Sequence, residues 1–253
     1  MSDLLLNARF LMRHSTGVDR VAAELMCALD RLGLPDGLNN WRALLPAGQI
    51  AYPEKAPPEI TQRMAPTLSR LDGHLWEQLI LGRSEPDNWL ISLCNTGPIL
   101  RRKHIVMLHD AQVFRQPESY SRIFRTFYRT LQPHLGRRAA MVLTVSEHSK
   151  NELEHFGVVP EGKVRVVPNG ADHILRTPAD LRILTRHNLK PQGYFLAIGS
   201  QAPHKNLSLL ALAASSRTDT SKPLIFAGEG SAAAFARANI KATDDIRDRK
   251  AHV

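Results

Sequence analysis

The chain has 253 residues, 43% of them hydrophobic, which is enough to form one large domain or two small ones. Its formal net charge is +9, which suits acidic ligands, but this charge is spread along the chain and no aromatic residues alternate with basic ones, so nucleic-acid binding is not expected. Only two cysteines are present, which argues against a disulfide framework or a cysteine-rich metal site.

The sequence also predicts where the protein is located. Residues 1–15 contain too short an apolar run for a signal peptide, and no apolar run approaches the roughly 20 residues of a membrane-spanning helix. We therefore expect a cytoplasmic protein, with contact to the inner face of the membrane allowed.

Short apolar runs predict buried strands, and these alternate along the chain with amphipathic helices. The predicted strands are 4–6, 41–45, 89–93, 105–108, 141–145, 164–167, 194–198 and 224–227. The predicted helices are 18–32, 68–81, 119–135, 147–156 and one that begins at Leu207. The proline-rich residues 46–66 are predicted to form a loop, and no strand is expected after residue 230. This alternation predicts parallel α/β layers, in two units that join near residue 172.

The first predicted helix follows a glycine-containing loop. Thr16 and Asp19 have the spacing of a capping box, with Asp in place of the usual Glu or Gln. Gly17 would let a ligand approach the backbone closely. It could also serve only the turn, which is the simpler role.

His109 and Asp110 come directly after the predicted strand 105–108. Open α/β sheets bind ligands at the carboxyl ends of their strands, and His109 is suited to proton handling or to hydrogen bonding a sugar hydroxyl. The alternative is a structural histidine that caps the strand, which is the commoner role for a lone histidine.

The predicted helix 119–135 has two different faces. Its apolar residues are Tyr120, Ile123, Phe124, Phe127 and Leu131. Its basic residues, on the opposite side, are Arg122, Arg125 and Arg129. A helix packed on a core with a solvated charged face is the commoner explanation and is favoured. A basic helix that touches anionic lipid or an anionic acceptor is the alternative.

Residues 194–212 predict a strand, a polar loop and a helix in succession. Asn206 is expected to cap the helix, and the predicted apolar stripe is Leu207, Leu209, Leu210 and Ala214. The free N–H groups of this helix, with the charge of Lys205, would bind a phosphate or diphosphate. An ordinary connection with a solvated lysine explains the same residues equally well.

Four segments, in this order, resemble the family 4 glycosyltransferases, which are retaining enzymes with the GT-B fold. They are STGVDRVAAEL (15–25), MLHDAQVF (107–114), the pair LTVSEHSKNEL and VRVVPNGAD (143–153 and 164–172), and FLAIGSQAPHKNLSLLALA (195–213). The first resembles the glycine loop of the family, although Asp19 replaces the second glycine. The last matches the family's G-x-x-x-P-[RH]-K-N-L phosphate loop.

The resemblance implies an α/β fold of the GT-B type. A complete N-terminal Rossmann-like domain (1–172) would bind the acceptor, and a partial C-terminal Rossmann-like domain (173–253) would bind a nucleotide-sugar. Transfer with retention, without a metal ion or other cofactor, would take place in the cleft between them. The donor would be a GDP- or UDP-sugar, with mannose suggested, and the acceptor a glycan or lipid-linked glycan in cell-surface polysaccharide synthesis.

The same resemblance assigns roles to individual residues. Lys205 would neutralise the donor diphosphate as the sugar–phosphate bond breaks, and His109 would hydrogen-bond the transferred sugar or its surroundings, so these two are the expected catalytic residues. The residues expected to bind the donor are Gly17, Gly199, Ser200, Lys205 and Asn206.

One departure from the family pattern concerns the C-terminal residues. The family continues with an acidic motif of the form E-x-F-G-L-P-x-x-E, and residues 231–253 contain nothing like it. This predicts a chain cut short relative to the family and weakly active or inactive alone. The alternative function is a non-catalytic binding module derived from the GT-B fold.

Overall fold

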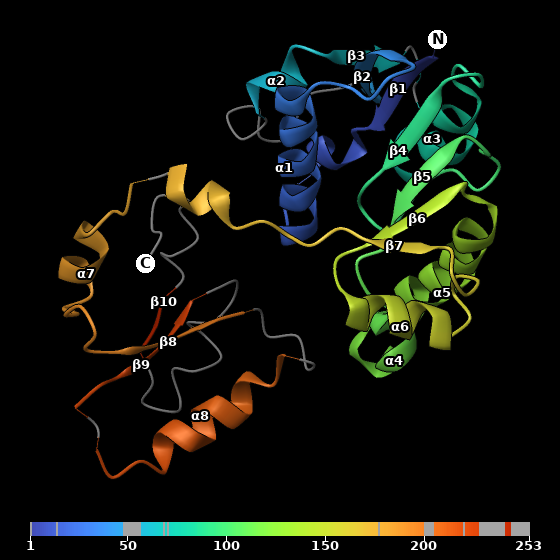
Figure 1. Cartoon of the computed structure of the whole chain (residues 1–253). Coiled ribbons are helices and arrows are strands. Elements are labelled where there is room, and N and C mark those ends of the chain that lie inside the picture. The colour runs from blue at the N-terminus through green and yellow to red at the C-terminus, as the bar shows by residue number, and fades with distance from the viewer. Residues whose placement is uncertain are drawn as a thin grey trace. The chain divides into compact units, whose positions relative to one another are not determined.

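The computed structural model describes residues 2–13, 15–47, 57–67, 69, 71–176, 178–199, 205–219, 221–227 and 241–243 (Figure 1). The chain divides into two compact units, Met1–Asn169 and Gly170–Val253. Each unit is an α/β structure with a parallel sheet.

The first unit contains a seven-stranded sheet with the order β3-β2-β1-β4-β5-β6-β7, and every neighbouring pair is parallel. Its strands are β1 (Ser2–Asn7), β2 (Leu38–Pro46), β3 (Met64–Thr67), β4 (Trp89–Ser92), β5 (His104–Met107), β6 (Met141–Thr144) and β7 (Val164–Val166). Its helices are α1 (Gly17–Leu32), α2 (Pro58–Thr61), α3 (Gly73–Leu79), α4 (Gln112–Arg115), α5 (Arg122–Arg138) and α6 (Glu147–His155), with 3-10 turns at Arg9–Met12, Leu81–Arg83 and Pro117–Ser119.

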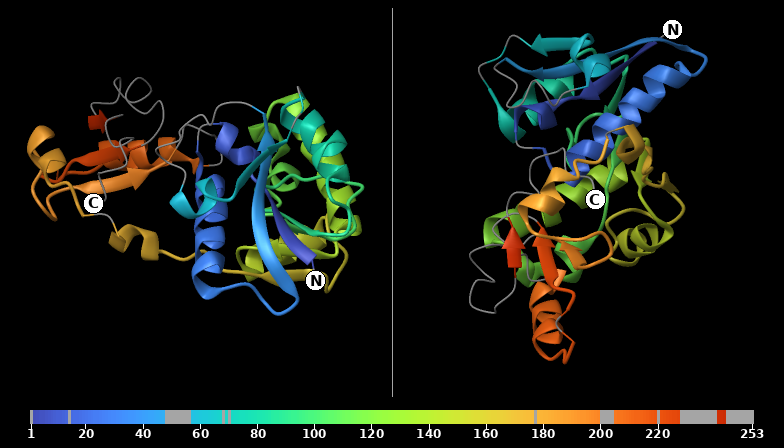
Figure 2. Two further views of the ribbon diagram at one scale, coloured as in Figure 1. Left: turned by 90° about the horizontal axis from the view of Figure 1, so that it is seen from above. Right: turned by 90° about the vertical axis from the view of Figure 1, so that its left-hand side faces the viewer.

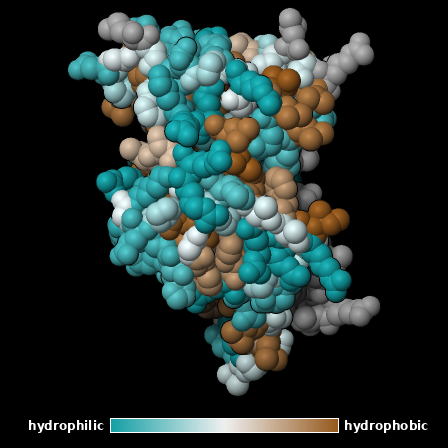
Figure 3. All heavy atoms as spheres, turned by 90° about the vertical axis from the view of Figure 1, so that its right-hand side faces the viewer, coloured by the Kyte–Doolittle hydropathy of each residue, from teal (hydrophilic) through white to brown (hydrophobic). Residues whose placement is uncertain are grey.

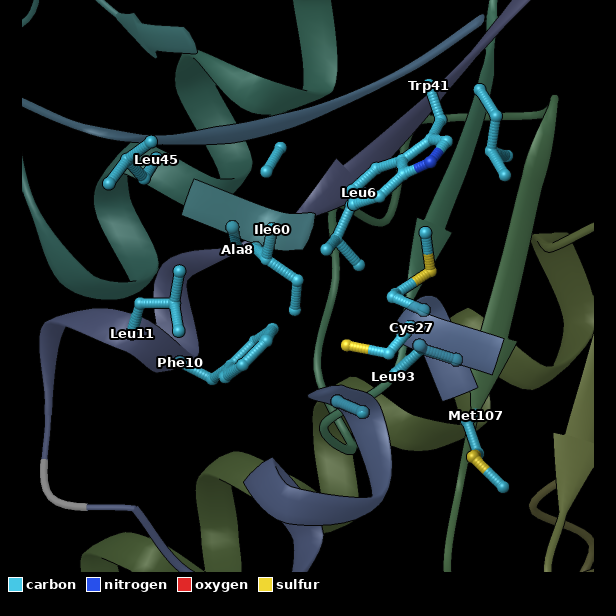
Figure 4. Close-up of a cluster of buried hydrophobic side chains, with 14 residues drawn as sticks. Leu6, Ala8, Phe10, Leu11, Cys27, Trp41, Leu45, Ile60, Leu93 and Met107 are labelled. Atoms are coloured by element: carbon cyan, nitrogen blue, oxygen red, sulfur yellow. The ribbon is translucent and has the colours of Figure 1, made fainter. Parts of the chain in front are cut away.

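Helices cover both faces of this sheet, as Figures 1 and 2 show for α1 and α3. Side chains alternate across a strand, so Leu4 and Leu6 of β1 pack in one cluster with Met26 of α1, while Leu5 packs with Trp76 of α3 on the other face. The first cluster is drawn in Figure 4. All of these side chains are buried, which explains why the strands read as continuous apolar runs.

The expected loop at 46–66 is wrong in its second half. The short helix α2 begins with Pro58 at its first position, where the missing N–H costs nothing. Strand β3 then pairs with β2, with Ala43 opposite Met64. Because β3 is the edge strand of the sheet, it tolerates Pro66, which a central strand would not.

The helix predicted at 68–81 is shorter, since α3 covers Gly73–Leu79 and is followed by a 3-10 turn. The helix predicted at 147–156 is confirmed in its cap as well. The Ser146 hydroxyl accepts a hydrogen bond from the Ser149 N–H, and Gly157 follows the helix at φ +64°.

The second unit has three parallel strands in the described residues, in the order β10-β9-β8. They are β8 (Phe195–Ile198), β9 (Leu224–Ala227) and β10 (Lys241–Thr243); the helices are α7 (Arg182–Arg186) and α8 (Leu207–Ser215), with a 3-10 turn at Asp172–Arg176. The expectation that no strand follows residue 230 is therefore wrong, because β10 continues the sheet beside β9.

The predicted apolar stripe of α8 is correct only in part. Leu207 and Ala211 are buried with Phe226 of β9, as residues one turn apart should be. Leu209 and Leu210 are 57% and 43% exposed, because only the face that bears Leu207 and Ala211 meets β9 within the described residues.

Across the same described ranges, every helix is too short or too polar to span a lipid bilayer.

Candidate functional site

The first unit has a topological switch point between two central strands. From β1 the sheet extends through β2 and β3 in one direction, and from β4 it extends through β5 to β7 in the other. All strands are parallel, so their carboxyl ends meet at one edge, where open α/β sheets bind ligands. Asn7 ends β1 and Ser92 ends β4, which places two polar side chains at this point.

A buried carboxylate, Glu77 of α3, is the centre of a polar network at this edge. Its Oε1 accepts hydrogen bonds from Asn7 Nδ2 (2.6 Å) and Thr96 Oγ1 (2.9 Å) and lies 3.5 Å from Arg9 Nε. Its Oε2 lies 3.2 Å from His74 Nδ1. Burial alone would raise the pKa of Glu77, but the contacts with His74, Arg9 and Asn7 outweigh it and lower the pKa. Glu77 is therefore an ionised group held by hydrogen bonds from Asn7, Thr96 and His74 and by the charge of Arg9.

Our sequence prediction did not include this network. The sequence contained one signal for it, since His74 and Glu77 are polar residues three positions apart in a segment whose Trp76 is completely buried. Such a pair lies on one side of a helix and can act together.

His109 lies past the end of β5 and is 6% exposed. Its Nε2 lies 2.9 Å from the Leu93 carbonyl oxygen, which can only accept, so Nε2 carries the hydrogen. Burial lowers the pKa of His109, against the opposing effects of the Leu93 carbonyl, Asp110 and Asp19, so the ring is neutral. One of its two nitrogens thus has the structural role that the sequence left open as an alternative, and Nδ1 remains for a ligand.

Gly17 is the first residue of α1, is exposed and has no atom close to where a Cβ would be. Asp19, 2% exposed, accepts hydrogen bonds from the Thr16 N–H (2.9 Å), the Thr16 hydroxyl (2.8 Å) and Arg13 Nη2 (2.7 Å). The predicted capping interaction is confirmed. The residue that replaces the second glycine of the family pattern therefore ties the loop to the helix.

In the second unit, the predicted succession of strand, loop and helix is present between β8 and α8. The Gly199 N–H donates to the Ala227 carbonyl (3.0 Å), and Lys205 is exposed two residues before α8 begins. The expected Asn206 cap is wrong, because Asn206 has a left-handed backbone (φ +47°) and its side chain makes no capping bond. Ser200 lies outside the described residues. The candidate residues thus form two groups, Gly17 and His109 in one unit and Gly199, Lys205 and Asn206 in the other.

The expectation that α5 packs on a core with its apolar side chains is correct only in part. Its second half is packed, since Leu131 and Leu135 are buried. Its first half exposes Ile123 (86%) and Phe124 (41%) beside Arg122 and Arg129. Figure 3 shows one face of the molecule, on which separate hydrophobic areas interrupt a mainly hydrophilic surface.

A second buried histidine near the switch point predicts how stability depends on pH. His104 is completely buried, and burial lowers its pKa from 6.5 to about 3. Between these values the unfolded chain binds a proton that the folded chain does not, so stability falls as the pH falls below 6.5. The expected contribution is about 1.4 kcal/mol per pH unit.

We expect this slope of unfolding free energy against pH, measured by urea denaturation from pH 7 to pH 5, to become smaller in His104→Phe. The exposed His148, substituted in the same way, provides the control and should leave the slope unchanged. Equal slopes in all three proteins would contradict the assignment.

No group of three or more His, Cys, Asp or Glu side chains is placed to hold a metal ion in the part of the chain that the structure describes.

The fold is of the GT-B type, and its likeness to solved structures extends over most of the chain. Sucrose-phosphate synthase from Thermosynechococcus elongatus matches with a TM-score of 0.60 and 13% identity, over 96% of this chain and 69% of that one. UDP-N-acetylglucosamine 2-epimerase from Rickettsia bellii matches with a TM-score of 0.52 and 13% identity, over 96% of this chain and 67% of that one.

Parts of the chain are similar in sequence to known glycosyltransferases. Residues 78–174 match the model of Glycosyltransferase Family 4. O-antigen chain mannosyltransferase B of Escherichia coli is 31% identical over 107 residues, which are 41% of this chain and 28% of that protein. O-antigen chain mannosyltransferase RfbU of Salmonella typhimurium is 30% identical over 116 residues, 45% of this chain and 29% of that protein. The matched segments thus span less than a third of these relatives.

Proposed function

We propose that this protein is a retaining glycosyltransferase that moves a sugar, with mannose favoured, from a GDP- or UDP-sugar to a glycan or lipid-linked glycan in cell-surface polysaccharide synthesis. The observation that carries the proposal is the family match at 78–174, together with two similar proteins that are O-antigen chain mannosyltransferases. In this proposal residues 1–172 bind the acceptor and residues 173–253 bind the nucleotide-sugar.

The donor diphosphate binds at the junction of β8 and α8. The first N–H groups of α8 have no partner within the helix and favour an anion, and the exposed ammonium group of Lys205 stands just before them. Negative charge grows on the diphosphate as the sugar leaves, so a fixed cation there stabilises the transition state more than the ground state. Gly199 and Asn206 flank this donor loop, and Ser200 stays a predicted donor-binding residue.

In the first unit, His109 and Gly17 contact the sugar and the donor in this proposal. Nε2 of His109 is engaged by the Leu93 carbonyl, so Nδ1 accepts a hydrogen bond from a sugar hydroxyl. The exposed Gly17 lets the donor approach the start of α1 closely.

Sugar transfer by the full 253-residue chain tests this proposal. Radiolabelled GDP-mannose and UDP-glucose are incubated separately with lipid-linked glycans, and the linkage in the product is determined by NMR. We expect weak transfer from one donor, because the acidic motif of the family is absent from residues 231–253, with the new bond keeping the anomeric configuration of that donor. An inverted linkage contradicts retention. Donor binding without any product supports instead a non-catalytic binding module.

We also propose that the protein works in the cytoplasm, in contact with the inner face of the membrane through the first half of α5. Exposed Ile123 and Phe124 beside arginine side chains combine an apolar contact with attraction to anionic headgroups. We expect sedimentation with vesicles that contain phosphatidylglycerol, and weaker binding at high salt.

The double substitution of Ile123 and Phe124 by glutamate should abolish this sedimentation. Leu100, a 66% exposed leucine of the same unit, provides the control as Leu100→Glu and should leave it unchanged. Equal binding by wild type and the double variant would rule out this surface.

A further inference from the structure

The side chain of His74 connects the buried network at the switch point with the surface. His74 belongs to α3, and its side chain is 39% exposed, whereas that of its partner Glu77 is 0% exposed. We infer that His74, oriented by Glu77, binds a hydroxyl group of the acceptor sugar through its Nε2 atom. This inference rests on the proposed sugar transfer and adds a residue on the acceptor side.

The hydrogen-bond partner of His74 fixes which of its nitrogens is free. Nδ1 lies 3.2 Å from Glu77 Oε2, and an ionised carboxylate only accepts, so Nδ1 donates its hydrogen in this contact. Nε2 is then the nitrogen that remains for a ligand. Among the residues that the structure describes, it has no hydrogen-bond partner. It can therefore hydrogen-bond a ligand hydroxyl, a group that both donates and accepts.

The ring is held from two directions. On one side Glu77 is itself fixed by Asn7 and Thr96, which are supplied by β1 and the segment after β4. On the other side the His74 ring packs on Phe127 of α5, with 4.3 Å between the ring centroids. A side chain held in this way loses little freedom when a ligand binds, and this strengthens each hydrogen bond that it makes.

The position of His74 suits an acceptor site. Glu77 joins it to Asn7 and Thr96, so its ring lies near the carboxyl ends of β1 and β4, where open sheets bind ligands. Phe127, on which the His74 ring packs, also lines an open surface depression of about 440 Å³ together with Arg122, Ile123 and Thr126. In His109, by contrast, Nε2 is engaged by the Leu93 backbone carbonyl, so its Nε2 is not available to a ligand in the way that Nε2 of His74 is.

NMR of the whole chain, with its histidines labelled with ¹⁵N, tests the inference without any transfer reaction. The signals of His74 are identified by their loss in His74→Phe, which keeps the aromatic contact with Phe127 but removes both nitrogens. We expect the Nδ1–H form in the free protein, and a shift of the Nε2 signal when methyl α-mannopyranoside is added. His74→Phe should weaken binding of this glycoside about tenfold, the effect of one lost hydrogen bond.

Two further variants separate orientation from general damage. Glu77→Gln removes the charge that orients the ring, so it should reduce the Nδ1–H form and weaken glycoside binding in parallel. His148→Phe, at an exposed position of α6, should change neither. An Nε2–H form in the wild type, or a His74 signal that the glycoside does not shift, would overturn the inference.

Failure of this inference is distinguishable from failure of the proposed function. The titration with GDP-mannose described below reports on the donor loop of the second unit and does not involve His74. Donor binding without a response of His74 removes only the acceptor assignment. Absent donor binding removes the sugar-transfer proposal.

Discussion

Glu77→Ala is expected to lower the free energy of unfolding by about 3–5 kcal/mol, the cost of breaking a buried ion pair on one side. The substitution leaves the donors of Asn7, Thr96 and His74 without their acceptor, and it removes the counter-charge of Arg9. Urea denaturation followed by tryptophan fluorescence measures this effect. All three tryptophans lie in the first unit, so the signal reports on the unit that contains Glu77.

An exposed glutamate provides the control for this prediction. Glu147 is 72% exposed and pairs with Lys150 on the surface of α6, so Glu147→Ala should change the free energy by at most about 0.5 kcal/mol. Similar losses in the two variants would show that the Glu77 network does not stabilise the sheet edge.

Lys205→Ala is expected to lower kcat/KM for the sugar donor by about a hundredfold to a thousandfold. The ammonium group is proposed to stabilise charge that develops on the leaving diphosphate, and no other cation of the described donor loop could replace it. Because Lys205 is exposed, the unfolding transition should not change. Steady-state kinetics with GDP-mannose and with UDP-glucose measures the loss.

Lys222, an exposed lysine of the same unit, is the matched control, and Lys222→Ala should keep the wild-type rate. Equal rates for the two variants would show that the effect of Lys205 is no more than that of general surface charge.

The central strands of the first unit could be predicted from the sequence because they are largely buried and read as apolar runs. The errors occur at the edges of sheets. Strand β3 contains Pro66, and β10 follows an alanine-rich segment, so neither has the apolar run that a central strand has. Their positions follow from pairing with β2 and β9, which is a tertiary interaction that local sequence does not encode.

The candidate site could be predicted only where one stretch of sequence carries it. The proposed donor loop is continuous in sequence from 198 to 207, and His109 follows its strand directly, so both could be proposed from the sequence, and their roles stay predictions. The Glu77 network joins Asn7, Arg9, His74 and Thr96, and these residues meet only because β1 and β4 are neighbours. Strand order is a long-range property, and the spacing of residues along the chain does not contain it. The Asn206 cap failed for another reason, since its left-handed backbone carries the chain into α8 without a side-chain bond.

Isothermal titration calorimetry of wild type and Lys205→Ala with GDP-mannose, repeated with UDP-glucose, tests the central claim most directly. If the chain uses a nucleotide-sugar at the start of α8, the wild type binds one of them and the variant binds it at least about tenfold more weakly, as expected when a charged contact is lost. A wild type that binds neither nucleotide-sugar, or a variant that binds as tightly as the wild type, would contradict the account.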